Sequence, residues 1–215
     1  MEQQRILPTG ATGRGLTVDH LIDVFAAYDP RPGDIRGDHD LNGFRPKPDN
    51  REAAVLIPIV KRKDGLSVLF TKRTDHLKNH PGQISFPGGH TEEEDESAEH
   101  AALRETEEEV GLPHDYIQVI GRLNDYVTRT GFRVTPVIGL VEAPYPTDPD
   151  EHEVAEVFEV PLSFLMDKAN HQKCSRIFMG VKRYFWAMPY EDYFIWGATA
   201  GMLKNLYDVL EEKGE

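Results

Sequence analysis

Three glutamates provide the clearest chemical signal in the sequence, because their spacing places them on one side of a predicted helix. The helix is expected over residues 97–110, where Glu108 and Glu109 follow Glu105 by three and four positions. At about 100° per residue, the three side chains share a stripe roughly 100° wide. Like charges at this spacing destabilise a helix by roughly 0.2–0.5 kcal/mol per pair, and partial burial raises the cost. A hard divalent cation such as Mg²⁺ would compensate this cost, since it prefers carboxylate oxygens.

Small apolar residues continue the same stripe toward the start of the helix: Ala98, Ala101 and Ala102. Because such residues mark the face that packs on the protein, we expect the three carboxylates to face inward or to line a cleft. A Glu-rich helix more often presents a solvated face, and we expect this of Glu107, on the opposite side, and of the acidic run Glu92–Glu96. Arg104 precedes the first glutamate and is expected to orient one of the carboxylates.

The composition limits the class of protein and the kind of ligand to which this helix can belong. The chain has 215 residues and a formal net charge of -13, from 24 Lys and Arg against 37 Asp and Glu. Its 39% hydrophobic share is sufficient for a core and argues against a disordered chain. The acidic balance argues against a nucleic-acid partner, because phosphate backbones require clustered Lys and Arg. Cations could still bridge the acidic chain to a phosphorylated small molecule.

Cysteine usage and hydropathy bear on the compartment. Cys174 is the single cysteine, which precludes an intrachain disulfide and fits a reducing environment. The apolar run over residues 53–60 is far shorter than the ~20 residues that span a bilayer, and the first residues lack the apolar region of a signal peptide. We therefore expect a soluble, cytoplasmic protein without a membrane partner.

The remaining elements predict an α/β fold, with a mixed sheet and helices on its faces. A buried strand over residues 53–60 and its partner over residues 66–71 flank Asp64-Gly65, a hairpin turn signal. Alternation of strands with a few helices favours this class. Further strands are predicted over residues 117–123, 134–141, 155–160 and 183–188, and a last helix over residues 198–212, all within a domain of residues 51–215.

Residues 1–50 are expected to form an N-terminal extension of helix and loop that packs on this domain. Thr17 is expected to cap a short helix whose apolar residues share one face. The Pro- and Gly-rich residues 29–50 predict a connecting loop, and residues 1–16 a mobile segment.

The glutamate helix resembles the signature of a known family. The run Arg104-Glu105-x-x-Glu108-Glu109-x-Gly111-Leu112, preceded by Gly88-Gly89 and an acidic loop, resembles the Nudix box, G-x5-E-x7-R-E-U-x-E-E-x-G-U, with U a bulky aliphatic residue. Two positions depart from it. Six residues separate Gly89 from Glu96 where the signature has five, and Thr106 stands at the first U.

The sequence before the box is similar to that of one subgroup. Leu69-Phe-Thr-Lys-Arg-Thr74 and Gly82-Gln-Ile-Ser-Phe-Pro-Gly-Gly89 resemble L-L-T-x-R-S and G-Q-x-x-F-P-G-G of the coenzyme A diphosphatases. A longer loop after Gly-Gly is also usual in that subgroup. The resemblance covers about residues 15–212.

This resemblance implies a Nudix α/β/α sandwich and Mg²⁺- or Mn²⁺-dependent hydrolysis of a nucleoside diphosphate linked to another group. The subgroup implies cleavage of coenzyme A to 3′,5′-ADP and 4′-phosphopantetheine. Two alternatives keep the fold: another substrate, such as ADP-ribose, a dinucleotide or a nucleoside triphosphate, or a non-catalytic nucleotide sensor. The intact glutamate stripe argues against a sensor. The expected partner is a small nucleotide, coenzyme A first, and a homodimer is a possible assembly.

The resemblance also suggests roles for the glutamates. Glu105 and Glu109, one turn apart, are the first choices for metal ligands. Glu108 is a third ligand or the group that accepts a proton from the attacking water. Gly88-Gly89 is expected to form a turn, in which Gly89 could add a backbone carbonyl because no side chain blocks the approach. Nudix enzymes often bring a further glutamate from a remote loop, and Glu153, with Glu151 in reserve, is the candidate here. Either Glu108 or Glu153 could be the base. The alternative for Glu151 and Glu153 is that they are ordinary loop acids.

Substrate contacts are expected mainly from the upstream motif. Arg73 follows a strand end, and its planar guanidinium suits a phosphate, although a surface salt bridge is an equal alternative. Gln83 is a weaker candidate for a polar contact, and Gly88 is placed with the substrate-binding residues. Four aromatic residues could stack on an adenine, although strand-spaced aromatics more often belong to a core: Tyr184, Trp186, Tyr193 and Trp196.

Overall fold

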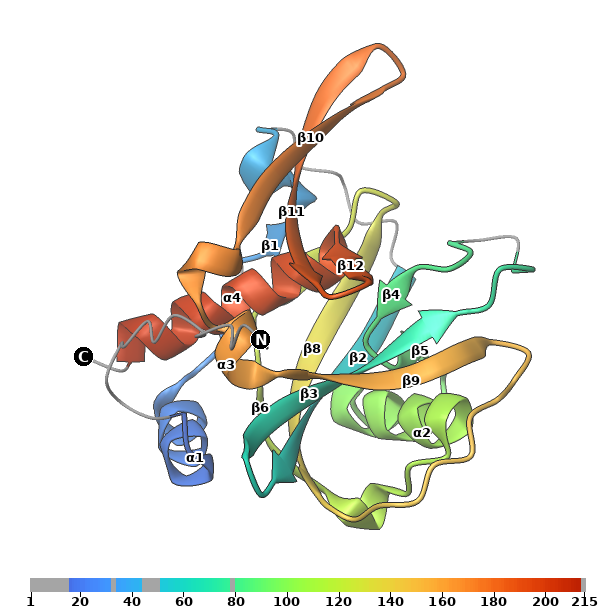
Figure 1. The fold of residues 1–215 in the computed structure, drawn as a ribbon, viewed down its shortest axis with the longest axis vertical. Helices are drawn as coiled ribbons and strands as arrows, with labels where there is room; N and C mark the ends of the chain where they lie inside the picture. The colour runs from blue at the N-terminus through green and yellow to red at the C-terminus, as the bar shows by residue number, and fades with distance from the viewer. Residues whose placement is uncertain (1–15, 32–33, 44–50, 78–79, 214–215) are drawn as a thin grey trace, which may run out of the picture.

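The central element of the fold is strand β2 (Arg51–Arg62), whose middle is buried on both faces. Because successive side chains of a strand point to opposite faces, Ala54 and Leu56 face one apolar cluster, and Ile57 and Ile59 face another. The long apolar run of the sequence therefore suits a strand between two layers. The structure is a computed structural model that describes residues 16–31, 34–43, 51–77 and 80–213 (Figure 1).

A mixed sheet is built around β2, as predicted. Strand β8 (Phe132–Glu142) pairs with it in parallel, and β3 (Gly65–Arg73) pairs with it antiparallel after the expected hairpin turn. The sheet also contains β1 (Arg36–Gly37), β4 (Ile84–Ser85), β5 (Gly88–His90), β6 (Ile117–Arg122), β7 (Tyr126–Val127) and β9 (Val154–Pro161). The strands predicted over residues 53–60, 66–71, 117–123, 134–141 and 155–160 are all present, with ends that shift by one to two residues.

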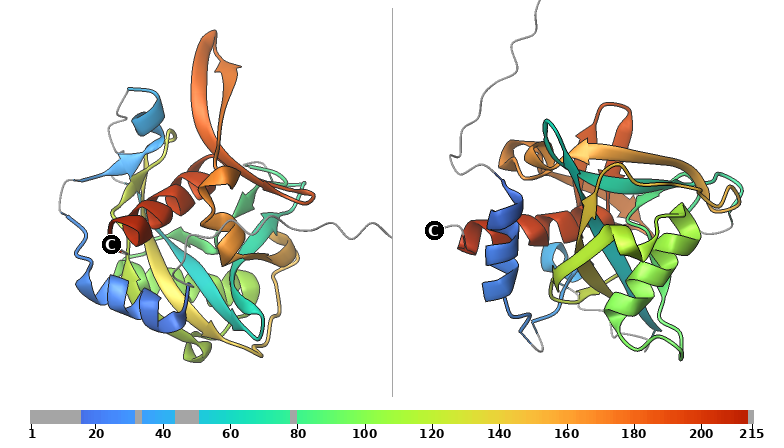
Figure 2. Two further views of the ribbon diagram at one scale, coloured as in Figure 1. Left: turned by 60° about the vertical axis from the view of Figure 1, so that its left-hand side comes forward. Right: turned by 90° about the horizontal axis from the view of Figure 1, so that it is seen from below.

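Helices cover both faces of this sheet, which confirms the predicted α/β/α sandwich (Figure 2). Helix α2 (Ala98–Val110) packs Ala101 and Ala102 against the Leu56 side of β2. On the other face, α1 (Val18–Ala27) and α4 (Ala198–Lys213) contribute Leu21 and Leu203 to the main core. The alanine face of the glutamate helix is therefore the face that packs on the sheet.

The sequence signals at the helix ends correspond to hydrogen bonds. Ser97 caps α2, where its hydroxyl oxygen accepts from the His100 amide, and Gly111 ends α2 in the left-handed region with φ 68°. Thr17 caps α1 in the same way as Ser97 caps α2. Local chain chemistry thus fixes where the glutamate helix begins and ends.

Two predictions of irregular structure are wrong. The predicted loop over residues 29–50 contains β1 and a 3₁₀-helix, η1 (Asp38–Leu41), and the predicted Gly88-Gly89 turn is strand β5, antiparallel to β2. Strands of two or three residues are too short to show a periodic pattern, and glycine is depleted in strands. Residues 1–15, predicted to be mobile, and residues 32–33 and 44–50 of the predicted loop lie outside the described residues.

A second sheet consists of β10 (Gln172–Phe178), β11 (Val181–Tyr190) and β12 (Tyr193–Trp196), of which only residues 183–188 were predicted. The hairpin of β10 and β11 projects from the molecule (Figure 1). Most of its outer residues are exposed, so no buried alternation marks the strands. The other short helices are η2 (His114–Tyr116), α3 (Leu162–Leu165) and η3 (Lys168–Asn170). No helix in the described part of the chain is long and apolar enough to cross a bilayer.

We predict that Gly111→Ala destabilises the protein more than Gly180→Ala. Both glycines have left-handed backbones, with φ 68° and 76°, where a side chain costs roughly 1–2 kcal/mol. At Gly111 the new Cβ would also lie 2.8 Å from Cα of Asp148, whereas Gly180 has open space around it. Urea denaturation of the two variants measures the difference. Equal losses would contradict a rigid contact between Gly111 and Asp148.

Candidate active site

The glycine strand β5 brings its backbone against two of the three glutamates. It pairs with β2, on which α2 also packs, so β5 and α2 are held side by side. The Gly88 amide donates a hydrogen bond of 3.1 Å to Oε2 of Glu109. A Cβ on Gly89 would lie 2.5 Å from Oε1 of Glu105, so only glycine allows this approach. The structure thus brings together Glu105, Glu109, Gly88 and Gly89, four of the predicted site residues.

Burial leaves these two carboxylates short of compensating charge. Glu109 is only 8% exposed, and burial raises the pKa of its carboxyl to about 7, against the Gly88 amide and Arg73, which lower it. Burial also raises the pKa of Glu105, although Arg104 opposes this. A perturbed pKa of this kind, beside a second carboxylate, is typical of a functional site.

Arg104 lies at the centre of a group of ion pairs and orients Glu105, as the sequence predicts. Its Nη1 lies 3.1 Å from Oε1 of Glu105, and its Nη2 donates to the carbonyl of His90. Two further hydrogen bonds, of 3.1 and 3.0 Å, join the guanidinium to both oxygens of Asp95. The Asp95 side chain is 1% exposed, and Arg104 holds its pKa well below the usual range. Asp95 therefore fixes Arg104 from the loop before α2.

Asp95 corrects the prediction that the whole acidic run Glu92–Glu96 is solvated. Five residues separate Gly89 from Asp95, as in the family signature, so the signal for this position was present in the sequence. Glu96, which matches the signature by its spacing of seven residues before Arg104, is exposed. The acidic charge nearest to Arg104 is thus a buried aspartate.

Glu108 lies at the edge of the group, so of the three carboxylates expected to face inward or to line a cleft it is the one that is not buried. Its side chain is 61% exposed, and Oε2 lies 3.2 Å from Nη1 of Arg104. Glu107 is solvated, as predicted, and pairs with the exposed His114. The stripe therefore has two half-buried or buried members, Glu105 and Glu109, and one at the solvent boundary.

The end of β3 adds a positive charge to the group. Arg73 Nη1 lies 3.7 Å from Oε1 of Glu109, and Arg73 Nη2 lies 3.5 Å from Oε2 of Glu153. The backbone amide of Arg73 donates to the carbonyl of Gln83, so Gln83 positions Arg73 through its main chain. Arg73 thus forms salt bridges, which was the alternative to a phosphate contact. Its partners, Glu109 and Glu153, are themselves candidate site residues.

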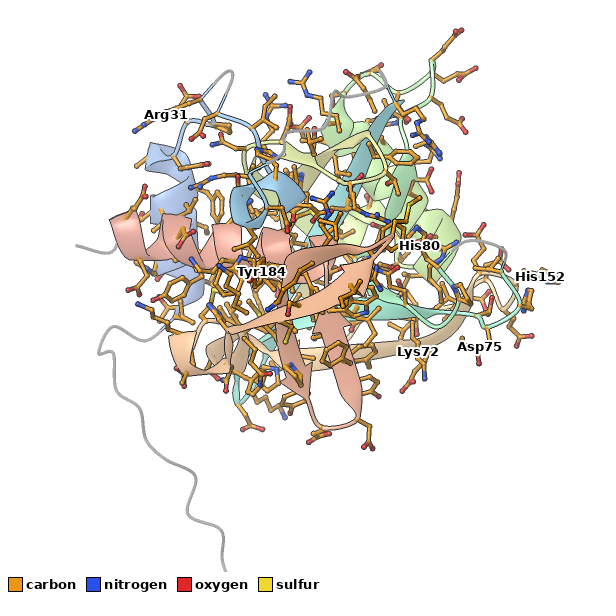
Figure 3. The ribbon with its side chains drawn as sticks, turned by 90° about the horizontal axis from the view of Figure 1, so that it is seen from above. Arg31, Lys72, Asp75, His80, His152 and Tyr184 are labelled. Atoms are coloured by element: carbon orange, nitrogen blue, oxygen red, sulfur yellow. The ribbon has the colours of Figure 1, made fainter. Side chains whose placement is uncertain are left out.

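Glu153 reaches the site because β9 pairs with β3 and brings the preceding loop to the end of β3. The Thr74 amide donates to the Glu153 carbonyl, and the Thr74 hydroxyl donates to that of His152. Figure 3 shows Asp75 and His152 together on one side of the molecule, where these two loops meet. The Glu153 side chain is 47% exposed, and Glu151, in the same turn, is exposed.

The donor set fits a hard divalent cation in chemistry, although the side chains are not already arranged around one position. In the described ranges, no group of three or more His, Cys, Asp and Glu side chains is poised to hold a metal. Glu105 directs Oε1 to Arg104, and Glu109 directs Oε2 to Gly88. Their carboxylates are oxygen ligands of the type that Mg²⁺ and Mn²⁺ prefer, and their burial would be compensated by such an ion.

The four predicted aromatic residues lie on other elements. Tyr193 stacks on Phe158, and Trp186 packs against the main core, which is the alternative that the sequence left open. Tyr184 and Trp196 are among the residues that line a cavity along the β10–β11 hairpin.

Comparisons with known proteins agree with this arrangement. The sequence pattern of the family described as NUDIX domain matches residues 50–179. The protein named Uncharacterized Nudix hydrolase NudL from Escherichia coli K12 is 39% identical over 193 residues, covering 90% of this chain and 94% of that relative. Its namesake from Shigella boydii serotype 4 is also 39% identical, with the same coverage.

A solved structure is similar in fold. The crystal structure of RenU, a Nudix hydrolase from M. smegmatis, has a TM-score of 0.50 at 20% identity and covers 75% of this chain and 86% of that chain. The sequence pattern and the relatives together establish the family: this chain belongs to the Nudix family and is a Nudix hydrolase, an enzyme that acts on the diphosphate bonds of nucleoside diphosphate derivatives.

Proposed function

We propose that this enzyme hydrolyses the diphosphate bond of coenzyme A, or of its derivatives, to 3′,5′-ADP and 4′-phosphopantetheine. The observation that carries the proposal is the contact between the upstream motif and the glutamates. Arg73, from the Leu69–Thr74 part of that motif, lies beside Glu109, and Gly88, from the Gly82–Gly89 part, donates to it. The residues by which the sequence resembles coenzyme A diphosphatases are thus neighbours of the glutamate pair.

Nudix hydrolases use divalent metal ions, and in this proposal Glu105 and Glu109 would hold Mg²⁺ or Mn²⁺, with Glu108 and the Gly89 carbonyl as further ligands. Such an ion would neutralise phosphate oxygens and lower the pKa of a bound water. Arg104 keeps Glu105 in position through its bonds to Asp95 and His90.

Arg73 is proposed to bind a substrate phosphate. Its separations of 3.7 Å from Glu109 and 3.5 Å from Glu153 are longer than close charge-assisted hydrogen bonds. Its N–H groups can therefore turn to a phosphate while the carboxylates keep its charge in place. Gln83 contributes by anchoring the Arg73 backbone, and Gly88 by its amide, which holds the neighbouring Glu109 carboxylate.

Two residues can accept the proton of the attacking water, Glu108 and Glu153. Both have side chains at the solvent boundary, at 61% and 47% exposure, and each is paired with one arginine of the site. Glu153 reaches the site from the loop before β9, which the β3–β9 pairing brings to the end of β3. Separate Glu108→Gln and Glu153→Gln variants identify the base by the larger fall in kcat at an unchanged KM.

Coenzyme A is the expected substrate. Purified protein incubated with coenzyme A and Mg²⁺ or Mn²⁺ is expected to release 3′,5′-ADP, detected by chromatography, and EDTA is expected to stop the release. The same panel includes ADP-ribose, a dinucleotide and a nucleoside triphosphate. Turnover of one of these without release of 3′,5′-ADP from coenzyme A would refute the substrate but not the family.

The second prediction concerns the ligands. Glu105→Gln and Glu109→Gln are each expected to lower kcat by at least about 100-fold, because an amide binds a hard cation far more weakly than a carboxylate. Glu107→Gln, on the exposed side of the same helix, is the matched control and should keep its activity. Circular dichroism verifies folding. Unchanged rates in both site variants would overturn the ligand assignment.

The third prediction follows from the raised pKa of Glu109. Between its ordinary value of 4.5 and about 7 in the fold, the folded state holds a proton that the unfolded chain has lost. The metal-free protein should therefore lose stability as the pH rises through this range, on the order of 1–3 kcal/mol. Urea denaturation in EDTA at pH 5 and pH 8 measures this loss. In Glu109→Gln it should be smaller than in wild type, and in Glu107→Gln it should persist; equal losses in all three would contradict the assignment.

A further inference from the structure

The β10–β11 hairpin carries a charge opposite to that of the rest of the chain. Residues 172–183 contain four basic and no acidic residues, in a protein with a formal net charge of -13. The register pairs Arg176 directly with Arg183, so both guanidinium groups leave the same face of the hairpin. Like charges directly opposite each other destabilise a pair of strands unless an anion compensates them.

A third arginine faces the same place from another element. Arg129, in the turn between β7 and β8, and Arg176 both stack on Phe178, with guanidinium carbons 3.9 and 5.9 Å from the ring centre. Arg176 also lies 4.8 Å over the ring of Trp196. A guanidinium that stacks on a ring keeps its N–H edge free for an anion. Within the described ranges, none of the three arginines forms an ion pair with a carboxylate.

These arginines line a cavity of about 260 Å³, near the lower end of the roughly 300–1,000 Å³ of small-molecule sites. Its other walls include three aromatic residues, Phe178, Phe185 and Trp196, whereas the Tyr184 ring contacts Lys173 and Lys182 on the opposite face of the hairpin. The one carboxylate in the lining, Asp38, is already engaged, because it accepts hydrogen bonds from the Tyr126 hydroxyl and the Arg129 amide.

The cavity is held open by main-chain contacts. The Asn42 side chain bonds to both the amide and the carbonyl of Tyr184, with distances of 2.8 and 2.9 Å, and thereby fixes η1 against β11. Trp196 packs edge to face on Phe185, with ring centres 5.4 Å apart. The rings of Phe185 and Trp196 and the main chain beside them therefore have positions set before any ligand binds, which lowers the entropic cost of binding.

We propose that this cavity is a second nucleotide site, for a phosphorylated nucleoside whose phosphate contacts Arg129, Arg176 and Arg183 and whose base contacts the aromatic wall. It lies apart from the glutamates: the hairpin and α2 occupy different ends of the molecule, and Tyr184 lies away from Asp75 and His152 (Figures 1 and 3). The site goes beyond the proposed hydrolysis, since it requires neither the glutamates nor a metal.

The test is calorimetric titration of the metal-free full-length enzyme with AMP in EDTA, where hydrolysis cannot occur. We expect the double variant Arg176→Gln/Arg183→Gln to bind AMP at least about 10-fold more weakly than wild type, since two charge-assisted contacts are lost. The matched control is Lys173→Gln/Lys182→Gln, which removes the same charge from the opposite face of the same strands and should bind within about 2-fold of wild type. Thermal unfolding verifies that both variants are folded.

Two further arms separate the possible results. Inorganic phosphate should bind at least about 10-fold more weakly than AMP, and equal binding would overturn the nucleotide assignment. Glu105→Gln should bind AMP as wild type does, whatever its effect on hydrolysis. Loss of AMP binding in Glu105→Gln would place the nucleotide at the glutamates and overturn the second site. Absence of AMP binding, or equal weakening in the lysine control, would also overturn it.

Discussion

Two carboxylates held against a glycine strand are the constraint on which the rest of the structure depends. Glu105 and Glu109 sit where β5 has no side chains, and burial raises the pKa of both groups. Three groups partly compensate the buried negative charge: the Gly88 amide, Arg73 and the Arg104–Asp95 pair. None of them cancels the charge fully, and a divalent cation would compensate what remains.

The architecture explains why this constraint can be sustained. Strand β2 is apolar on both faces, so it accepts α2 on one face and α1 with α4 on the other. Its parallel partner β8 and its antiparallel partner β3 then fix where the loops emerge. Arg73 and Glu153 are 80 residues apart in the sequence, and the pairing of β3 with β9 places them 3.5 Å apart. The sheet thus positions charges that the helix alone cannot.

The parts that depend on near neighbours could be predicted from the sequence. The caps at Thr17, Ser97 and Gly111 and the two-faced strand β2 follow from local composition and periodicity. The burial of Asp95 was missed although its spacing from Gly89 was a signal, because acidic runs are usually solvated and its partner Arg104 lies nine residues later, in the middle of α2. Apart from residues 183–188, the second sheet also escaped prediction, since its β10 strand is exposed on much of its surface and lacks the alternation that marks a half-buried strand.

The loop between β8 and β9 has a consequence for how this enzyme can diversify. The amides of Asp148 and Asp150 donate to the last carbonyls of α2, at Val110 and Glu109, and Thr74 binds the same loop three residues later. The chain from Asp148 to Glu153 is therefore tied at both ends to fixed elements. An insertion there would pull the remote glutamate out of reach, whereas the preceding residues 143–147 lie before the first tether. In this loop, a change of length is thus compatible with activity before Asp148, in residues 143–147, and not between Asp148 and Glu153.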